Sequence, residues 1–173
     1  SIDFLRRIGA KSEGIYRLLE NVLISDQNPV VRLAAMRALL NNYPAKSEEP
    51  IKWVLHHDEN DFLLKFLSDF LENSKAMDFD SLKENMDDWF RNSYGVVLEE
   101  AKLLLEISVF RVDIHVKEAL YYEIKDRHVI SLNLYRIGLK RLPRRIKSLS
   151  RLLELNLRGN NFSEFSEALL TLK

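Results

Sequence analysis

The sequence predicts a mixed α and β protein in which an N-terminal all-α solenoid of helical hairpins precedes a helix-and-hairpin cap and a short α/β repeat solenoid. Three observations predict this fold class. An apolar pattern starting at Val129 recurs from Leu152, a helical pattern starting at Leu19 recurs from Ile51, and the two parts carry opposite charge. Repeats of this kind bury their apolar faces only against a neighbouring copy. We therefore expect helical repeats over 1–74, a connecting helix over 75–95, a cap over 96–128 and two repeat turns over 129–173.

Two helical hairpins are expected first. Apolar residues at helical spacing run through 15–23 and again through 30–39, on either side of the turn SDQNP. Asn28 followed by Pro29 indicates a helix start, because the asparagine side chain caps free amides and proline suits the first helical position. Asp26 and Asn28 return in the second copy of the pattern as Asp58 and Asn60. The second hairpin is therefore predicted to be a degenerate copy of the first.

The segment DQNPVVRLAAMRAL resembles the second helix of a HEAT repeat. In that family an aspartate and the arginine six residues later often form a ladder between stacked hairpins, and Asp26 and Arg32 occupy these positions. Asp58 remains in the second copy, but Leu64 replaces the arginine, so we expect the ladder to end there. The resemblance covers residues 12–74, and a generic array of helical hairpins is the alternative.

The middle of the chain is expected to connect and cap the repeats. A helix should start at Asp80 or Ser81, run through LKENMDDWFRN and end at Tyr94 and Gly95. The run VVLEEAKLLLEISVF predicts another helix, and ALYYEIKDRHVISLNL predicts two strands joined by a turn at 125–127. This helix and hairpin would cap the following repeat, because two turns fall below the roughly three repeats that a stable stack needs.

The C-terminal repeat covers eight positions, of which seven are apolar in both copies. The first-copy positions are Val129, Leu132, Leu134, Ile137, Leu139, Leu142, Ile146 and Leu149. The pattern LLELNLRGNNFSEF resembles the leucine-rich repeat family, in its 23-residue Leu-Pro form, and the preceding cap is similar to that of some prokaryotic leucine-rich repeat proteins. The resemblance implies that Asn160 bonds backbone groups of adjacent turns. Its counterpart Ile137 cannot, so the first turn departs from the pattern.

The resemblance also predicts a binding face. It implies short parallel strands from which four leucines point inward: Leu132, Leu134, Leu155 and Leu157. Because side chains alternate across a strand, the residues between and just after them should lie on the concave sheet face. These residues are Ser131, Asn133, Tyr135, Glu154, Asn156 and Arg158. In the family this face commonly holds a protein partner, and repeats bearing Leu-Pro resemble those of proteins that engage small GTPases, so a signalling regulator is one expectation.

Charge raises an alternative function. Residues 1–124 carry 15 basic and 22 acidic side chains, a net charge of −7, whereas residues 125–173 carry 11 and 4, a net charge of +7. A basic edge is expected from Lys140, Arg141, Arg144, Arg145, Lys147 and Arg151. Nucleic-acid binding through the basic face of residues 136–158 is therefore an alternative. Sparse aromatic residues there and the acidic helical part count against it, and the edge has simpler interpretations: a solvated face, attraction of an acidic protein or docking on the acidic part.

The sequence offers little catalytic chemistry. The motifs HExxH, GxGxxG, GxSxG and the Walker loop are all absent, and the adjacent His56 and His57 are interpreted as part of a solvated turn. We expect no catalytic, cofactor-binding or metal-binding residues and hence a non-enzymatic interaction or scaffold module. The alternative is a HEAT-like lyase or glycosylase-type enzyme or enzyme subunit, which predicts that four residues converge on one cleft: Trp53, Trp89, Asp58 and Asp61.

Composition suggests a compartment. The chain has no cysteines, which favours reducing conditions and a cytoplasmic location. Its start does not resemble a signal peptide, and no apolar run is long enough to span a membrane. Repeat-core residues occupy the last turn, so we expect further chain or a partner to cover that end.

Overall fold

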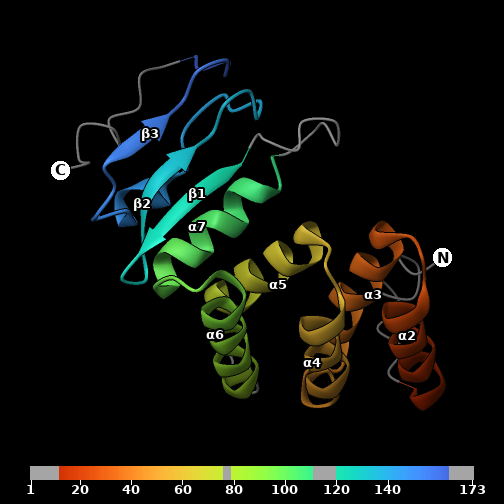
Figure 1. The fold of residues 1–173 in the computed structure, drawn as a ribbon. Helices are drawn as coiled ribbons and strands as arrows, with labels where there is room; N and C mark the ends of the chain where they lie inside the picture. Colours follow the sequence, from red (N-terminus) through yellow and green to blue (C-terminus); the bar gives the residue numbers. More distant parts are fainter. Residues whose placement is uncertain (1–11, 76–78, 111–119, 164–173) are drawn as a thin grey trace. The chain divides into compact units, whose positions relative to one another are not determined.

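The computed structural model describes residues 12–75, 79–110 and 120–163 (Figure 1). The chain divides into two compact units, Ser1–Trp89 and Phe90–Lys173. Most of the described residues are helical, and the second unit adds a three-stranded sheet, so the predicted mixture of α and β structure is confirmed. In the described ranges no helix is both long enough and apolar enough to cross a membrane.

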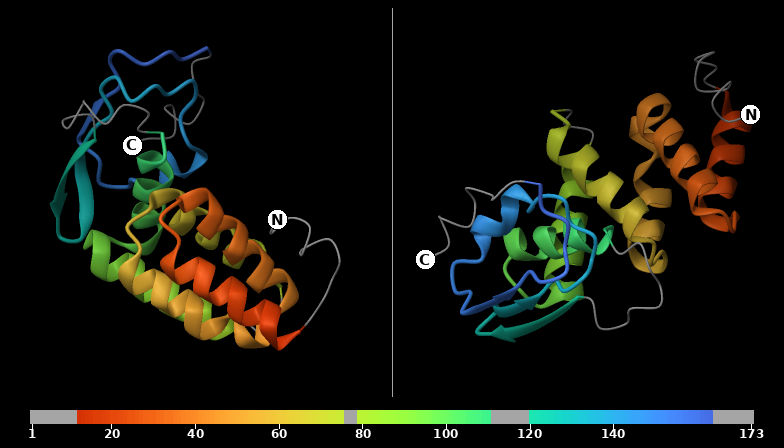
Figure 2. Two further views of the ribbon diagram at one scale, coloured as in Figure 1. Left: turned by 90° about the vertical axis from the view of Figure 1, so that its right-hand side faces the viewer. Right: turned by 90° about the horizontal axis from the view of Figure 1, so that it is seen from above.

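Helices α2 (Glu13–Ser25), α3 (Pro29–Asn42), α4 (Glu48–His57) and α5 (Asp61–Asn73) form two hairpins, and the short 3-10 helix Pro44–Lys46 precedes α4. Helices α2 and α4 end at Ser25 and His57, and α3 and α5 start at Pro29 and Asp61. Within each pair the sequence separation equals the offset between the two copies of the helical pattern. Within this unit α2 packs beside α3 and α4, and α3 packs beside α5 (Figure 2). Equivalent helices of the two hairpins are thus neighbours.

The two hairpin turns have the same construction. The carboxylate of Asp26 accepts from the backbone amide of Asn28 at 2.8 Å, and that of Asp58 accepts from the amide of Asn60 at 2.9 Å. Each asparagine side chain then caps the following helix by accepting a hydrogen bond from an amide of its first turn. Such caps contribute about 1 kcal/mol each. The repeated Asp-x-Asn spacing therefore sets where one helix stops and the next begins.

Helix α6 (Asp80–Tyr94) ends before Gly95, whose φ of 66° lies in the left-handed region that glycine adopts readily. Helix α7 (Leu98–Ser108) follows. Strand β1 (Tyr121–Lys125) then pairs antiparallel with β2 (His128–Asn133) across a two-residue turn at Asp126 and Arg127. Both turn residues have positive φ, at 52° and 64°, as a tight β-hairpin turn requires.

The third strand explains the C-terminal repeat. Strand β3 (Glu154–Asn156) lies parallel to β2, giving the order β1-β2-β3, and Leu132 is in register with Leu155. Equivalent positions in the two copies of the C-terminal pattern are therefore aligned with each other in the parallel strand pair. The 3-10 helix η3 (Arg144–Ser148) lies on the connection between the two strands. All eight repeat positions of the first turn are buried, whereas their described counterparts in the second turn are half-buried. The inward leucines are therefore fully covered only in the first turn.

Two polar side chains hold this unit together. Asn160 donates to the carbonyls of Leu134 at 2.6 Å and Leu157 at 2.9 Å, and accepts from the amide of Leu139 at 3.1 Å. The bonds with Leu134 and Leu139 join adjacent turns, as expected for Asn160, and the bond to Leu157 lies within its own turn. The second side chain is that of Glu100 on α7, which is fully buried.

Candidate protein-binding face

The six residues predicted for the sheet face come together on β2, β3 and their C-terminal extensions. Ser131 lies opposite Glu154, and Asn133 lies opposite Asn156, in the parallel register. The Ser131 hydroxyl donates to Glu154 Oε2 at 3.4 Å. Tyr135, Glu154 and Arg158 are exposed, and the other three residues are partly exposed. The face is therefore a solvent-accessible surface with mixed polar and aromatic character.

Strand β1 extends this face and was missed as part of it. Tyr121 lies opposite Asn133, and Glu123 lies opposite Ser131, so both side chains point to the same side of the sheet as their partners. Both are exposed. The Tyr121 hydroxyl donates to Glu123 Oε1 at 3.2 Å, and this carboxylate raises the pKa of Tyr121. Strand alternation continued across the hairpin would have indicated both residues, but the sequence analysis assigns the hairpin to the cap alone.

The two asparagines on the face have a structural role as well. Asn133 Oδ1 accepts from the amide of Tyr135 at 3.0 Å, and Asn156 Oδ1 accepts from the amide of Arg158 at 3.1 Å. Side-chain bonds of this type turn the backbone at the end of a strand. The side-chain oxygens of the two asparagines thus shape the loop.

Arg136 is a second feature that sequence analysis missed as a site residue. Its backbone amide donates to the Arg158 carbonyl at 3.0 Å, so the backbones of the two arginines lie side by side where β2 and β3 end. The guanidinium carbon of Arg136 lies 5.1 Å from the centre of the Tyr135 ring. This distance is within the range of a cation–π interaction. The face therefore ends in a ring and two cations.

The basic edge is divided by its interactions. Arg145 bonds Glu99 of α7 at 2.7 Å, and Arg151 lies 3.9 Å from Asp126. The other four residues are exposed and form no ion pair with any described residue: Lys140, Arg141, Arg144 and Lys147. Part of the positive charge is thus neutralised within the unit.

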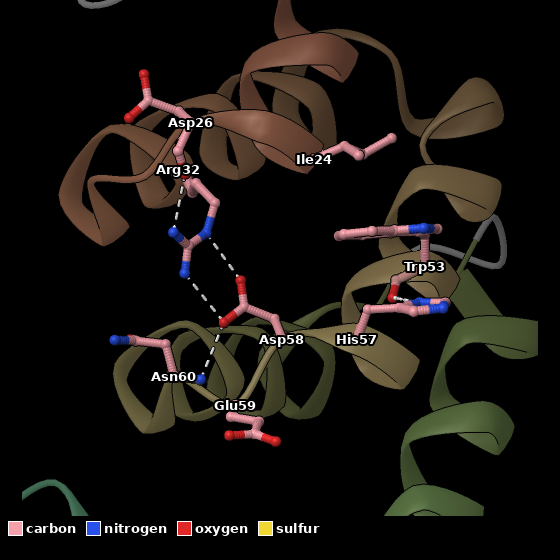
Figure 3. Close-up of a pocket in the computed structure, with 8 residues that line it drawn as sticks. All are labelled: Ile24, Asp26, Arg32, Trp53, His57, Asp58, Glu59 and Asn60. Atoms are coloured by element: carbon pink, nitrogen blue, oxygen red, sulfur yellow. Dashed lines mark hydrogen bonds and ion pairs between the residues drawn. The ribbon is translucent and has the colours of Figure 1, made fainter.

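A shallow pocket of about 450 Å³ lies on the helical unit (Figure 3). The guanidinium of Arg32 donates to both carboxylate oxygens of Asp58, at 2.8 and 3.1 Å, and to the Asp26 carbonyl at 2.9 Å. Trp53 forms another wall, stacked on the ring of His57 with centres 4.5 Å apart. Arg32 thus bonds the aspartate of the next hairpin, as a ladder between stacked hairpins would, and it reaches Asp26 only at the backbone carbonyl.

The enzyme alternative required four residues in one cleft. Trp53 and Asp58 line the pocket, whereas Asp61 and Trp89 are not among its lining residues. The Asp58 carboxylate is already shared between Arg32 and the Asn60 amide. Among the described residues, no group of three or more histidine, aspartate and glutamate side chains has the geometry to hold a metal ion.

Comparisons with protein-family models, with curated proteins and with solved structures give no match for this chain.

Proposed function

We propose that this chain is a non-enzymatic protein–protein interaction or scaffold module whose binding surface is the outward side of the three-stranded sheet. One observation carries the proposal: Tyr121 and Tyr135 lie exposed on a continuous face, while Val129 and Leu132 of the central strand are buried on the other side of the sheet, where α7 lies (Figure 1). We call the face made by Tyr121, Glu123, Ser131, Asn133, Tyr135, Glu154, Asn156 and Arg158 the sheet face.

The chemistry of the sheet face suits protein recognition. Tyrosine is enriched at protein interfaces because its ring supplies apolar area and its hydroxyl remains hydrated or bonded. The backbone under these side chains is held by strand pairing, so binding requires little new ordering. The resemblance of the C-terminal repeat to leucine-rich repeats supports the same face, since that family commonly binds protein there. A small GTPase and a signalling role follow from this resemblance alone, which is analogy at the level of fold.

The most enclosed carboxylates in the described structure support a binding rather than a catalytic role. Asp58 is engaged by Arg32, and Glu100 accepts bonds from His128 and from the buried amide of Val129. An acid or base catalyst must exchange a proton with substrate. These carboxylates instead join one structural element to another.

Affinity capture with the full chain tests the proposal. Tyr135→Ala together with Arg158→Ala should abolish recovery of a reproducible protein partner. The matched variant Phe62→Ala with Arg17→Ala removes one exposed ring and one exposed guanidinium from the helical unit and should retain the partner. Equal recovery with both variants would move the function away from the sheet face.

A further inference from the structure

The backbone at Arg136 is unusual for its residue type. Arg136 has a φ of 54°, and the residue at the same position of the second repeat turn is Gly159, with a φ of 75°. Both turns thus need a left-handed residue at this position. Glycine adopts this conformation freely, whereas other residues incur about 1 kcal/mol or more of strain. Strained residues of this kind cluster at functional sites, so the arginine side chain itself calls for an explanation.

The structure holds this side chain in one place. It lies across Gly159, where an added Cβ would come within 2.4 Å of Arg136 Cγ. The bare glycine therefore provides the space for the arginine stem. Beyond it the guanidinium approaches the Tyr135 ring, which limits its freedom further.

A second exposed arginine, Arg158, lies next to Arg136 along the backbone. The bond from the Arg136 amide to the Arg158 carbonyl puts the two backbones in contact. Neither side chain forms an ion pair with another residue of the described ranges. We call Tyr135, Arg136 and Arg158 the arginine corner.

We propose that the arginine corner binds an acidic segment of a protein partner by receiving an aspartate or glutamate carboxylate on its guanidinium groups. The proposal rests on the proposed function, because the corner is the end of the sheet face. Guanidinium is planar and presents paired donors that match the two oxygens of a carboxylate. A ligand carboxylate also brings a counter-charge to two exposed guanidinium groups that form no ion pair with a described residue.

The rest of the face favours an acidic protein over a nucleic acid. Glu123 and Glu154 are exposed on the same sheet face as the corner. Duplex DNA carries about one negative charge per 1.7 Å of its axis, so its backbone would meet these carboxylates as well as the arginines. A protein segment can place carboxylates at the corner and neutral side chains over the strands.

Fluorescence anisotropy with the full chain at low salt tests the proposal with three labelled probes: a glutamate-rich peptide, a lysine-rich peptide of equal length and a random DNA duplex. The glutamate-rich peptide should bind, and its affinity should fall as salt rises. Arg136→Gly with Arg158→Ser should weaken this binding at least tenfold. Because glycine relieves the strain at position 136, the fold should remain as stable as that of the unchanged chain.

The control variant combines Lys125→Ser with Arg127→Gly. It removes two exposed cations from the hairpin-turn end of the same sheet and also replaces an arginine of positive φ by glycine. It should bind the peptide with nearly unchanged affinity. An equal loss of peptide affinity in both variants would show that diffuse electrostatic attraction, and not the arginine corner, binds the peptide. Tighter binding of the duplex, or absence of peptide binding, would also overturn the proposal. If capture of a protein through Tyr135 and Arg158 survives such a result, the proposed function stands without this inference.

Discussion

Arg32 in the first helical hairpin donates two parallel N–H···O bonds, of 2.8 and 3.1 Å, to the carboxylate of Asp58 in the second. The side chains are 15% and 6% exposed. The pair therefore joins two successive helical hairpins through a partly desolvated contact. It also fixes the turn after α4, since the same Asp58 carboxylate accepts from the Asn60 amide.

Replacing Arg32 by alanine should destabilise the helical unit by about 3 kcal/mol, because Asp58 would remain as a buried charge without its partner. Urea unfolding followed by circular dichroism measures this loss. Arg17→Ala, which breaks only exposed ion pairs with Glu13 and Glu20, should cost under about 0.5 kcal/mol. Similar losses for the two variants would contradict the structural role of the Arg32 pair.

Gly159→Ala should destabilise the sheet-containing unit more than Gly138→Ala does. Both glycines have positive φ, so each substitution carries backbone strain of about 1 kcal/mol, but only at Gly159 would the new Cβ collide with Arg136. In an Arg136→Gly background the extra cost should disappear. A double-mutant cycle on unfolding free energies measures this coupling, and a coupling near zero would show that the arginine stem does not rest on Gly159.

Glu100→Ala should cost about 2 to 4 kcal/mol, because the carboxylate accepts from the buried amide of Val129 at 2.7 Å and that amide would lose its partner. Glu100→Gln should cost less, since its amide oxygen can still accept this bond. Thermal unfolding of the two variants gives the order. The idea fails if glutamine is as damaging as alanine, which would place the stabilisation in the contact with His128 instead.

Asn160→Asp should be nearly as destabilising as Asn160→Ala, with losses of about 2 kcal/mol or more. The asparagine both donates to two carbonyls and accepts from an amide, whereas an ionised aspartate only accepts and would face those carbonyls with a negative charge. Asn156→Ala is the comparison and should cost less, because its side chain accepts one bond from the Arg158 amide. Chemical denaturation measures these losses. If Asn160→Asp is as stable as the unchanged chain, the two bonds that Asn160 donates contribute little.

Much of the fold was predictable because its signals are local and repeated. The spacing of Asp26 and Asn28, and its return at Asp58 and Asn60, placed both turns between helices. Gly95 marked the end of α6, and the offset of the C-terminal repeat anticipated the register of Leu132 with Leu155. Each of these features depends on backbone conformation or side-chain periodicity that neighbouring residues impose.

The candidate site was predictable only in part. Alternation along two strands identified the six residues from Ser131 to Arg158, but the partners of a strand depend on pairing between distant segments. The register of the hairpin places Tyr121 and Glu123 on the face. In the basic edge, Arg145 forms an ion pair with Glu99, so its charge is neutralised within the unit. The sequence alone thus determined the repeats, their helix boundaries and the alternation of the strands, because these are set by local geometry. Only the tertiary structure decided that Arg32 bonds Asp58 and that Arg136 lies over Gly159, because such contacts depend on how whole elements pack.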